Sequence, residues 1–235
     1  MKLSDVMAAL EAMATPTTKR TFLRHGAPEP LYGVRVGDLK SLHKQLKGRQ
    51  DLALELYATG NSDAMYLAGM IADGSKMTRD QLNAWAAGAG WHMISGTTVP
   101  WVATEHPEGF ALARSWIDSG REQVAIAGWS TLAGLATTVP DERLALGELR
   151  ALLDRCARTI HGAPNRVRYA MNGFVISCGT YVASLADPAI QTARQMGPVA
   201  VDMGETSCQV PDAESSILKS RRGAPVAPKR RTLRC

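Results

Sequence analysis

The apolar residues of this chain recur at helical spacing, and almost no stretch alternates β-branched residues with polar ones. Leu39, Leu42 and Leu46 occupy positions i, i+3 and i+7 of one stretch, the spacing of a single helix face. A second leucine-rich stretch ends at Thr59-Gly60-Asn61, residues that favour a helix stop. Alanine and leucine, both strong helix formers, are abundant throughout. The pattern predicts an all-α protein without a β-sheet.

Short clusters of glycine, proline and small polar residues divide the helical pattern at frequent intervals. Such clusters mark turns, because glycine and proline interrupt regular structure. They are Asp73-Gly74-Ser75, His106-Pro107, Asp118-Ser119-Gly120, Val139-Pro140-Asp141, Gly162-Ala163-Pro164-Asn165 and Asp187-Pro188. Their spacing predicts helices of roughly ten to eighteen residues joined by tight turns.

Three segments look like weak copies of one another, each with a glycine inside a helical pattern: Gly69, Gly128 and Gly173. Glycine in a helix costs about 1 kcal/mol relative to alanine, so its recurrence predicts close approach between stacked helices. The separation of Gly128 and Gly173 fits a HEAT-type helical pair, whereas that of Gly69 and Gly128 is longer. The alternative is a non-repetitive helical bundle with chance glycines.

The last seventeen residues, 219–235, carry seven Lys or Arg side chains and no acid. Residues 1–218 then hold 20 basic and 22 acidic residues, a net charge of −2 against +5 for the whole chain. A flexible cationic tail on a nearly neutral body predicts a polyanion partner, because cations that neutralise phosphates release condensed counterions. A solvated, disordered terminus is the alternative.

The four cysteines Cys156, Cys178, Cys208 and Cys235 are widely spaced, without a Cys-x-x-Cys pair or a histidine at zinc-ligand spacing. They predict neither a disulfide framework nor a metal site, and no glycine-rich fingerprint of a nucleotide cofactor is present. Residues 1–6 predict the start of an amphipathic helix rather than an export signal. No apolar run approaches the length of a membrane span, so we expect a cytoplasmic monomer without cofactors.

A set of motifs along nearly the full length resembles the bacterial DNA alkylation repair family of AlkD-like proteins. The similar segments are LYGVRVGDL (residues 31–39) with the basic stretch after it, LELY (54–57), GWHM (90–93), TVPW (98–101), His106-Pro107, VDMGET (201–206), VPDA (210–213) and KRRTLRC (229–235). The resemblance implies a curved solenoid of HEAT-like helical pairs over residues 1–200, followed by a C-terminal extension, 201–235, with the basic tail. It also implies that duplex DNA, plain or alkylated, lies on the concave face, and that active members remove N3- or N7-alkylated purines.

Active relatives, by the same resemblance, place an Asp one helical turn after a Trp on the central helix. Trp91 matches this Trp. The carboxylate position falls on Ser95, or on Gly96 when the alignment is anchored at Val99-Pro100, and no Asp or Glu occurs in residues 81–100. The carboxylate stabilises positive charge that develops on the sugar, and a neutral serine hydroxyl supplies only a dipole.

Two further site residues of the family are also replaced. The expected Arg falls on Ile126 and the expected later Trp falls on Phe174. Trp91 and Phe174 would still offer apolar faces to a sugar or a cation, whereas His92 would add positive charge if it were protonated. We therefore expect a protein that binds DNA with weak or no base excision.

The residues expected to contact DNA combine this site with basic side chains of the body and the tail. They are Trp91, Ser95, Phe174, Arg166, Arg168, Lys219, Arg221, Arg222, Lys229, Arg230 and Arg231. One alternative is a glycosylase whose carboxylate comes from a distant helix, such as Glu55, Asp63 or Glu122. Another is a protein-interaction scaffold, which predicts an apolar or acidic concave face.

Overall fold

The computed structural model describes residues 1–234, and all regular structure in this range is helical. The α-helices are α1 (Leu3–Ala12), α2 (Pro16–Arg24), α3 (Leu39–Leu46), α4 (Gln50–Ala58), α5 (Ser62–Ile71), α6 (Arg79–Gly88), α7 (Val99–Glu105), α8 (Gly109–Trp116), α9 (Glu122–Thr138), α10 (Leu146–Thr159), α11 (Asn165–Tyr181), α12 (Ala186–Met196) and α13 (Ala213–Arg221). One turn of π-helix, η2 (Ile94–Thr98), leads into α7. The prediction of an all-α protein is confirmed.

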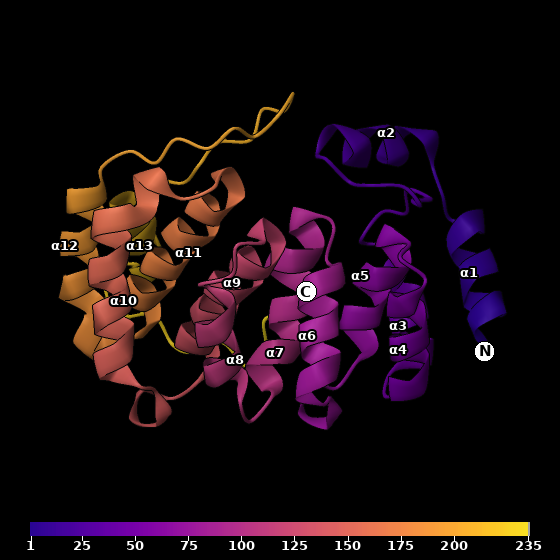
Figure 1. Cartoon of the computed structure of the whole chain (residues 1–235), viewed down its shortest axis with the longest axis horizontal. Helices are drawn as coiled ribbons and strands as arrows, with labels where there is room; N and C mark the ends of the chain where they lie inside the picture. The colour runs from indigo at the N-terminus through magenta and orange to yellow at the C-terminus, as the bar shows by residue number, and fades with distance from the viewer. Residues whose placement is uncertain (235) are drawn as a thin grey trace.

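Most helices follow one another in chain order, from α1 at one end of the molecule to α12 at the other, whereas α2 lies across the top of the row (Figure 1) and α13 packs back onto α11 and α12. The contacts pair α4 with α5, α6 with α7, and α8 with α9. The second members of these pairs, together with α11, also contact one another and form an inner layer. Its helices are α5, η2 with α7, α9 and α11.

Burial follows the position of each helix in the two layers. The outer helix α10 buries one face, through Leu149, Leu152, Leu153 and Cys156, the i, i+3, i+4, i+7 stripe of an amphipathic helix. The inner helix α9 is buried over most of its surface. Two apolar clusters fill the two halves of the array and meet at α8, which contributes to both.

Two of the three recurrent glycines allow close helix approach. A side chain at Gly69 would collide with Thr98, and one at Gly128 would lie 2.8 Å from Ile117 of the neighbouring helix. Gly173 is different, because a Cβ there would meet no atom within 4 Å. The expectation of close approach is therefore wrong for Gly173, which lies on an open surface.

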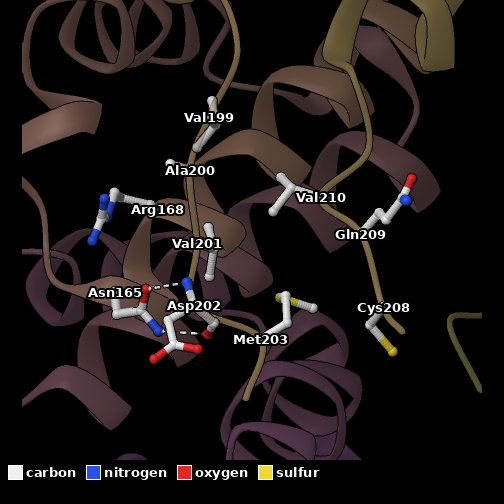
Figure 2. A pocket seen from close by; sticks show the side chains of 10 residues that line it. All are labelled: Asn165, Arg168, Val199, Ala200, Val201, Asp202, Met203, Cys208, Gln209 and Val210. Atoms are coloured by element: carbon white, nitrogen blue, oxygen red, sulfur yellow. Dashed lines mark hydrogen bonds between the residues drawn. The ribbon is translucent and has the colours of Figure 1, made fainter. Parts of the chain in front are cut away.

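The chain between α12 and α13 forms an extended arm, residues 199–210, that reaches along the array toward α2 (Figure 1). Figure 2 shows its two legs, with Asn165 of α11 at the base of one leg. The Asn165 side chain donates to the Asp202 carbonyl at 2.8 Å and accepts from the Asp202 amide at 2.8 Å. A hollow of about 530 Å³ lies between the legs and α11.

The expectation of a flexible basic tail is wrong for the residues that the structure describes. The tail begins in helix α13, which packs into the core through the buried side chains of Ala213 and Ile217. The chain then returns along the array as a segment that we call the strap, residues 222–234. The amide of Ala227 donates to the carbonyl of Thr180 at 2.8 Å, and that of Arg230 to the carbonyl of Thr137 at 3.0 Å. Backbone pairing of this kind fixes the strap to α11 and α9.

Among the described residues, no single helix combines the length and hydropathy of a membrane span. Helix α11 and the segment Ala183–Met196 meet both requirements only together, across a bend of 118°.

Two polar side chains at the start of α5 hold the backbone around them: Asn61 caps the helix, and the buried carboxylate of Asp63 holds the loop before α3. The Asn61 side chain accepts from the amides of residues 63 and 64, which satisfies donors that the first turn leaves free. Asp63 is 3% exposed, and its two oxygens accept from the amides of Tyr32, Gly33 and Val34 at 2.8, 2.9 and 2.9 Å. One side chain thus holds the loop before α3 against α5.

We expect Asp63→Ala to lower the free energy of unfolding by about 3 kcal/mol or more, because it leaves three amide donors without an acceptor and each buried unsatisfied group costs about 1 to 3 kcal/mol. Urea unfolding followed by circular dichroism measures this. Glu55→Ala, on the exposed side of α4, is the control and should change the value little. Equal stability of the two variants would contradict this role of Asp63.

Candidate nucleic-acid interface

A groove of about 650 Å³ crosses the inner layer, with walls from η2, α7, α9 and α11. His92 and Arg166 lie at the end of the groove where the inner helices begin, and Thr137, Thr180 and Arg230 lie where they end. None of the described residues that line the groove is Asp or Glu. The groove therefore offers cationic and neutral groups to a ligand, and no carboxylate.

The floor of the groove consists of small and aliphatic residues. A Cβ at Gly96 would lie 3.5 Å from the Ile126 side chain and 3.8 Å from the Ser130 hydroxyl. Gly173 also faces this space. The resemblance places a carboxylate of active relatives at Ser95 or Gly96 and an arginine at Ile126. Both charged side chains are therefore missing from this part of the groove, which is lined by small and aliphatic residues.

Trp91 does not face the groove. Its side chain is 4% exposed, its indole packs on Phe22 with ring centroids 5.2 Å apart, and its Nε1 donates to the His25 carbonyl at 2.9 Å. The expectation that Trp91 contacts DNA is therefore wrong for this conformation. It fixes the chain after α2 to the central repeat instead.

Ser95 and Phe174 are also internal, which corrects two further expectations. Ser95 is fully buried, and its hydroxyl donates to the Trp91 carbonyl at 3.3 Å. Phe174 is fully buried and packs on Trp129 with ring centroids 5.3 Å apart. Each is the immediate neighbour of a glycine that does line the groove, since Gly96 follows Ser95 and Gly173 precedes Phe174.

Arg166 is the basic residue of the body that the structure places in the groove. Its backbone amide donates to Glu122 at 2.7 Å, which ties the first turn of α11 to the first turn of α9. Its guanidinium donates to the sulfur of Met203 on the arm at 3.2 Å. Arg168 instead lines the hollow between the legs of the arm, so the two arginines expected to act together face different spaces.

His92 is held neutral at physiological pH. Burial, as the largest cause, together with the positive charges of Arg166 and His25 lowers its pKa from 6.5 to about 4. Desolvation disfavours the imidazolium. At neutral pH His92 therefore presents a hydrogen-bonding ring to the groove rather than a cation.

The basic residues from Lys219 onward divide into two groups. Arg221, Lys229 and Arg234 turn inward and donate to main-chain carbonyls. Lys219, Arg222, Arg230 and Arg231 are exposed. Arg230 also lines the groove. In this conformation only the exposed group can reach DNA, and its contact with DNA stays a prediction.

No group of three or more His, Cys, Asp or Glu side chains within residues 1–234 is arranged to hold a metal ion. Cys156 and Cys178 are buried, and burial raises the pKa of both thiols. Cys208 is exposed, whereas Cys235 lies outside the described residues.

Of the three distant carboxylates considered from the sequence, Glu122 lies nearest to the site. It lines a smaller hollow beside the groove with His92 and Arg166. Asp63 is occupied by three backbone amides, and Glu55 is exposed on α4. Of these three carboxylates, Glu122 is therefore the candidate that the enzymatic alternative retains.

The comparisons with known proteins agree with this architecture. The sequence model of the family described as DNA alkylation repair enzyme matches residues 6–204. The chain belongs to the DNA alkylation repair family. The resemblance seen in the sequence motifs is thereby confirmed.

Similar proteins of this family extend over nearly the whole chain. Two uncharacterised proteins, from Listeria innocua and Listeria monocytogenes, are 34% and 33% identical over 218 residues, covering 90% of this chain and 94% of each relative. A solved structure is 34% identical, with a TM-score of 0.91 and complete coverage of both chains. It is described as a new family of proteins related to the HEAT-like repeat DNA glycosylases with affinity for branched DNA structures. The HEAT-like fold is thus confirmed.

Sequence reasoning missed Tyr169, which is 40% exposed and lines the groove beside Arg166. A signal was present, because Tyr169 follows Arg166 by three residues and so shares its helix face. Aromatic faces of this kind stack on bases or pack on sugars. Tyr169 is a better candidate for such a contact than Trp91 or Phe174.

We expect the imidazole resonance of His92 to titrate with a midpoint near 4 in NMR spectra. Because the pKa in the folded protein is below that in the unfolded chain, protons bind the unfolded chain first as the pH falls, so His92 should reduce stability between pH 6.5 and about 4. Arg166→Gln should raise the midpoint only slightly, since burial is the larger cause. A midpoint near 6.5 in the native protein would contradict a desolvated His92.

Proposed function

We propose that this protein binds DNA in the groove of its inner helical layer and releases alkylated bases weakly or not at all. The supporting observation is the composition of that groove, which presents Arg166 and Arg230 at its two ends and no carboxylate among its described lining residues. Phosphates bind to such cations. The positive charge of an oxocarbenium-like sugar would meet no anion there.

Branched DNA is included in the proposed ligand, together with plain and alkylated duplexes. The relative of known structure, whose fold and length match throughout, is described as having affinity for branched DNA. Recognition of this kind rests on the backbone and its shape rather than on base edges. A broad groove with few donors and an exposed tyrosine suits such recognition. We also propose that the protein acts as a monomer.

The composition of the groove favours DNA over a protein scaffold. A scaffold reading predicts an apolar or acidic inner face, and the lining residues include two arginines without an acid. The glycosylase reading requires Glu122 to act, yet this carboxylate already accepts from the Arg166 amide at 2.7 Å. It lies at the edge of the groove rather than opposite Gly96.

We expect the wild-type protein to bind labelled duplex and four-way-junction DNA, and to release no 3-methyladenine or 7-methylguanine above background. Arg166→Gln should weaken binding and reduce the slope of log affinity against log salt by up to about 0.9, the value for one phosphate contact. Fluorescence anisotropy across a salt series measures binding, and chromatography of released bases measures excision. Arg158→Gln, at an exposed position of α10, is the charge-matched control.

Two results would decide against this function. Absence of binding to both DNA probes at low salt would refute DNA binding. Robust base release that Glu122→Gln abolishes would establish the glycosylase alternative instead.

We expect Gly96→Asp to fold like the wild type, because a Cβ at this position would meet its neighbours at ordinary contact distances of 3.5 and 3.8 Å and Gly96 lines the groove. It would restore an anion to the groove. Ser95→Asp should destabilise the fold, since its carboxylate would be buried without a partner. Measurable base release by Gly96→Asp but not by Ser95→Asp would support position 96 as the carboxylate position. The rate of base release should increase by at most roughly 10² to 10³, the effect of one electrostatic partner. Equal stability of both variants would contradict the burial of position 95.

A further inference from the structure

The helices of the inner layer end along one side of the groove, and there their last carbonyl groups lack helical partners. A helix C-terminus carries about −0.5 elementary charge, and several parallel helices that end together would repel phosphates. The strap runs along this side, since it pairs with Thr180 at the end of α11 and Thr137 at the end of α9.

Three cations from the end of α13 and the strap bind these carbonyl groups. Arg221 donates to the Gly179 carbonyl of α11 at 2.8 Å, and Lys229 donates to the Ala136 carbonyl of α9 at 2.8 Å. Arg234 donates to the Gly69 and Ala72 carbonyls at the end of α5, at 2.9 and 2.7 Å. Cations at these positions cap the helices and offset their dipoles.

Two of these cations are also paired with acids and largely buried. Lys229 lies 2.8 Å from Asp141, with its side chain 22% exposed. Arg234 pairs with Glu105 of α7, with its side chain 18% exposed. Leu233 packs beside Gly134 of α9, where any larger residue would collide with it. The strap is therefore attached to α5, α7, α9 and α11.

The remaining cations of this region point the other way. Arg230 and Arg231 are exposed between the inward Lys229 and Arg234, and Lys219 and Arg222 are exposed around Arg221. Arg230 lines the groove. The helices α9 and α11 each have 17 residues, so the strap lies about 25 Å from the side of the groove that holds Arg166.

We propose that the strap forms a second DNA-contacting edge of the groove, in which the inward cations Arg221, Lys229 and Arg234 cap the inner helices and the outward Arg230 and Arg231 contact a phosphodiester backbone. The proposal rests on the DNA-binding function proposed above and adds a division of roles within the basic tail. The inward cations offset the negative charge of the helix ends and of Asp141 and Glu105, which reduces the repulsion that phosphates would meet at this edge. Arg166 contacts a different stretch of backbone, at the opposite edge.

Deletion of the whole tail cannot test this division, because it removes both groups of cations at once. Point variants of the full-length chain separate them. The outward variant is Arg230→Gln/Arg231→Gln, and the inward variants are Lys229→Gln and Arg234→Gln. The control is Arg150→Gln/Arg158→Gln, which removes the same charge from exposed positions of α10. Each is measured for its urea unfolding midpoint and for the salt dependence of binding to a labelled 20-base-pair duplex and a four-way junction.

We expect the outward variant to keep the wild-type unfolding midpoint and to lose up to about 1.8 units of salt slope, the value for two phosphate contacts. The inward variants should lower the unfolding midpoint, because main-chain carbonyls and acids lose their partners. Arg234→Lys, which keeps the charge, is a milder form if Arg234→Gln does not fold. The control should match the wild type in both measurements.

If the outward variant keeps the wild-type affinity and salt slope while Arg166→Gln weakens binding, the strap is not a DNA-contacting edge. The proposed function would then still hold. An outward variant that unfolds as early as the inward variants would overturn the division of roles. Failure of the wild type itself to bind either probe would instead refute the proposed function.

Discussion

The parallel alignment of the inner helices is the constraint on which the rest of the structure depends. Helices α9 and α11 run in the same sense along the groove, since their first turns meet at Glu122 and Arg166 and their last turns both bind the strap, so their dipoles add rather than cancel. One edge of the groove gathers helix N-termini, with Arg166 on the first turn of α11, and the other gathers unpaired carbonyls. At this second edge the C-terminal residues Arg221, Lys229 and Arg234 place cations on those carbonyls, which is the arrangement that the proposed binding of a polyanion along both edges requires.

The same layer accounts for the proposed combination of DNA binding with weak or no base excision. The resemblance places a carboxylate at Ser95 or Gly96 and an arginine at Ile126, and of these positions Gly96 and Ile126 line the groove. Loss of these side chains leaves space without leaving an unpaired buried charge, so the fold is not strained by their absence. The large aromatic residues near the site, Trp91 and Phe174, are used for packing between repeats. Under the proposed function, binding and base excision would depend on different residues of this layer.

Two polar side chains, Asp63 in the core and Asn165 nearer the surface, position irregular segments of the chain. Asp63 holds the loop before α3 through three amides, and Asn165 holds the arm through both atoms of its amide. The arm in turn contacts Arg166 through Met203. Long irregular segments are thereby fixed beside the groove, and the side of the groove that carries Arg166 and His92 keeps a defined shape.

The sequence by itself determined the helical class, the positions of most turns, the family and the absence of an acid from residues 81–100, because each depends on local spacing or on residue identity alone. Tertiary structure decided which of two adjacent residues faces the groove. A helix turns by 100° per residue, so an alignment uncertain by one position could not distinguish buried Ser95 from groove-lining Gly96. It also decided the fate of the tail, since the partners of Arg234 are helix-end carbonyls more than 160 residues away in the chain. From the sequence alone, a run of charges predicts a solvated terminus, because the carbonyls that bind it come close only in the folded chain.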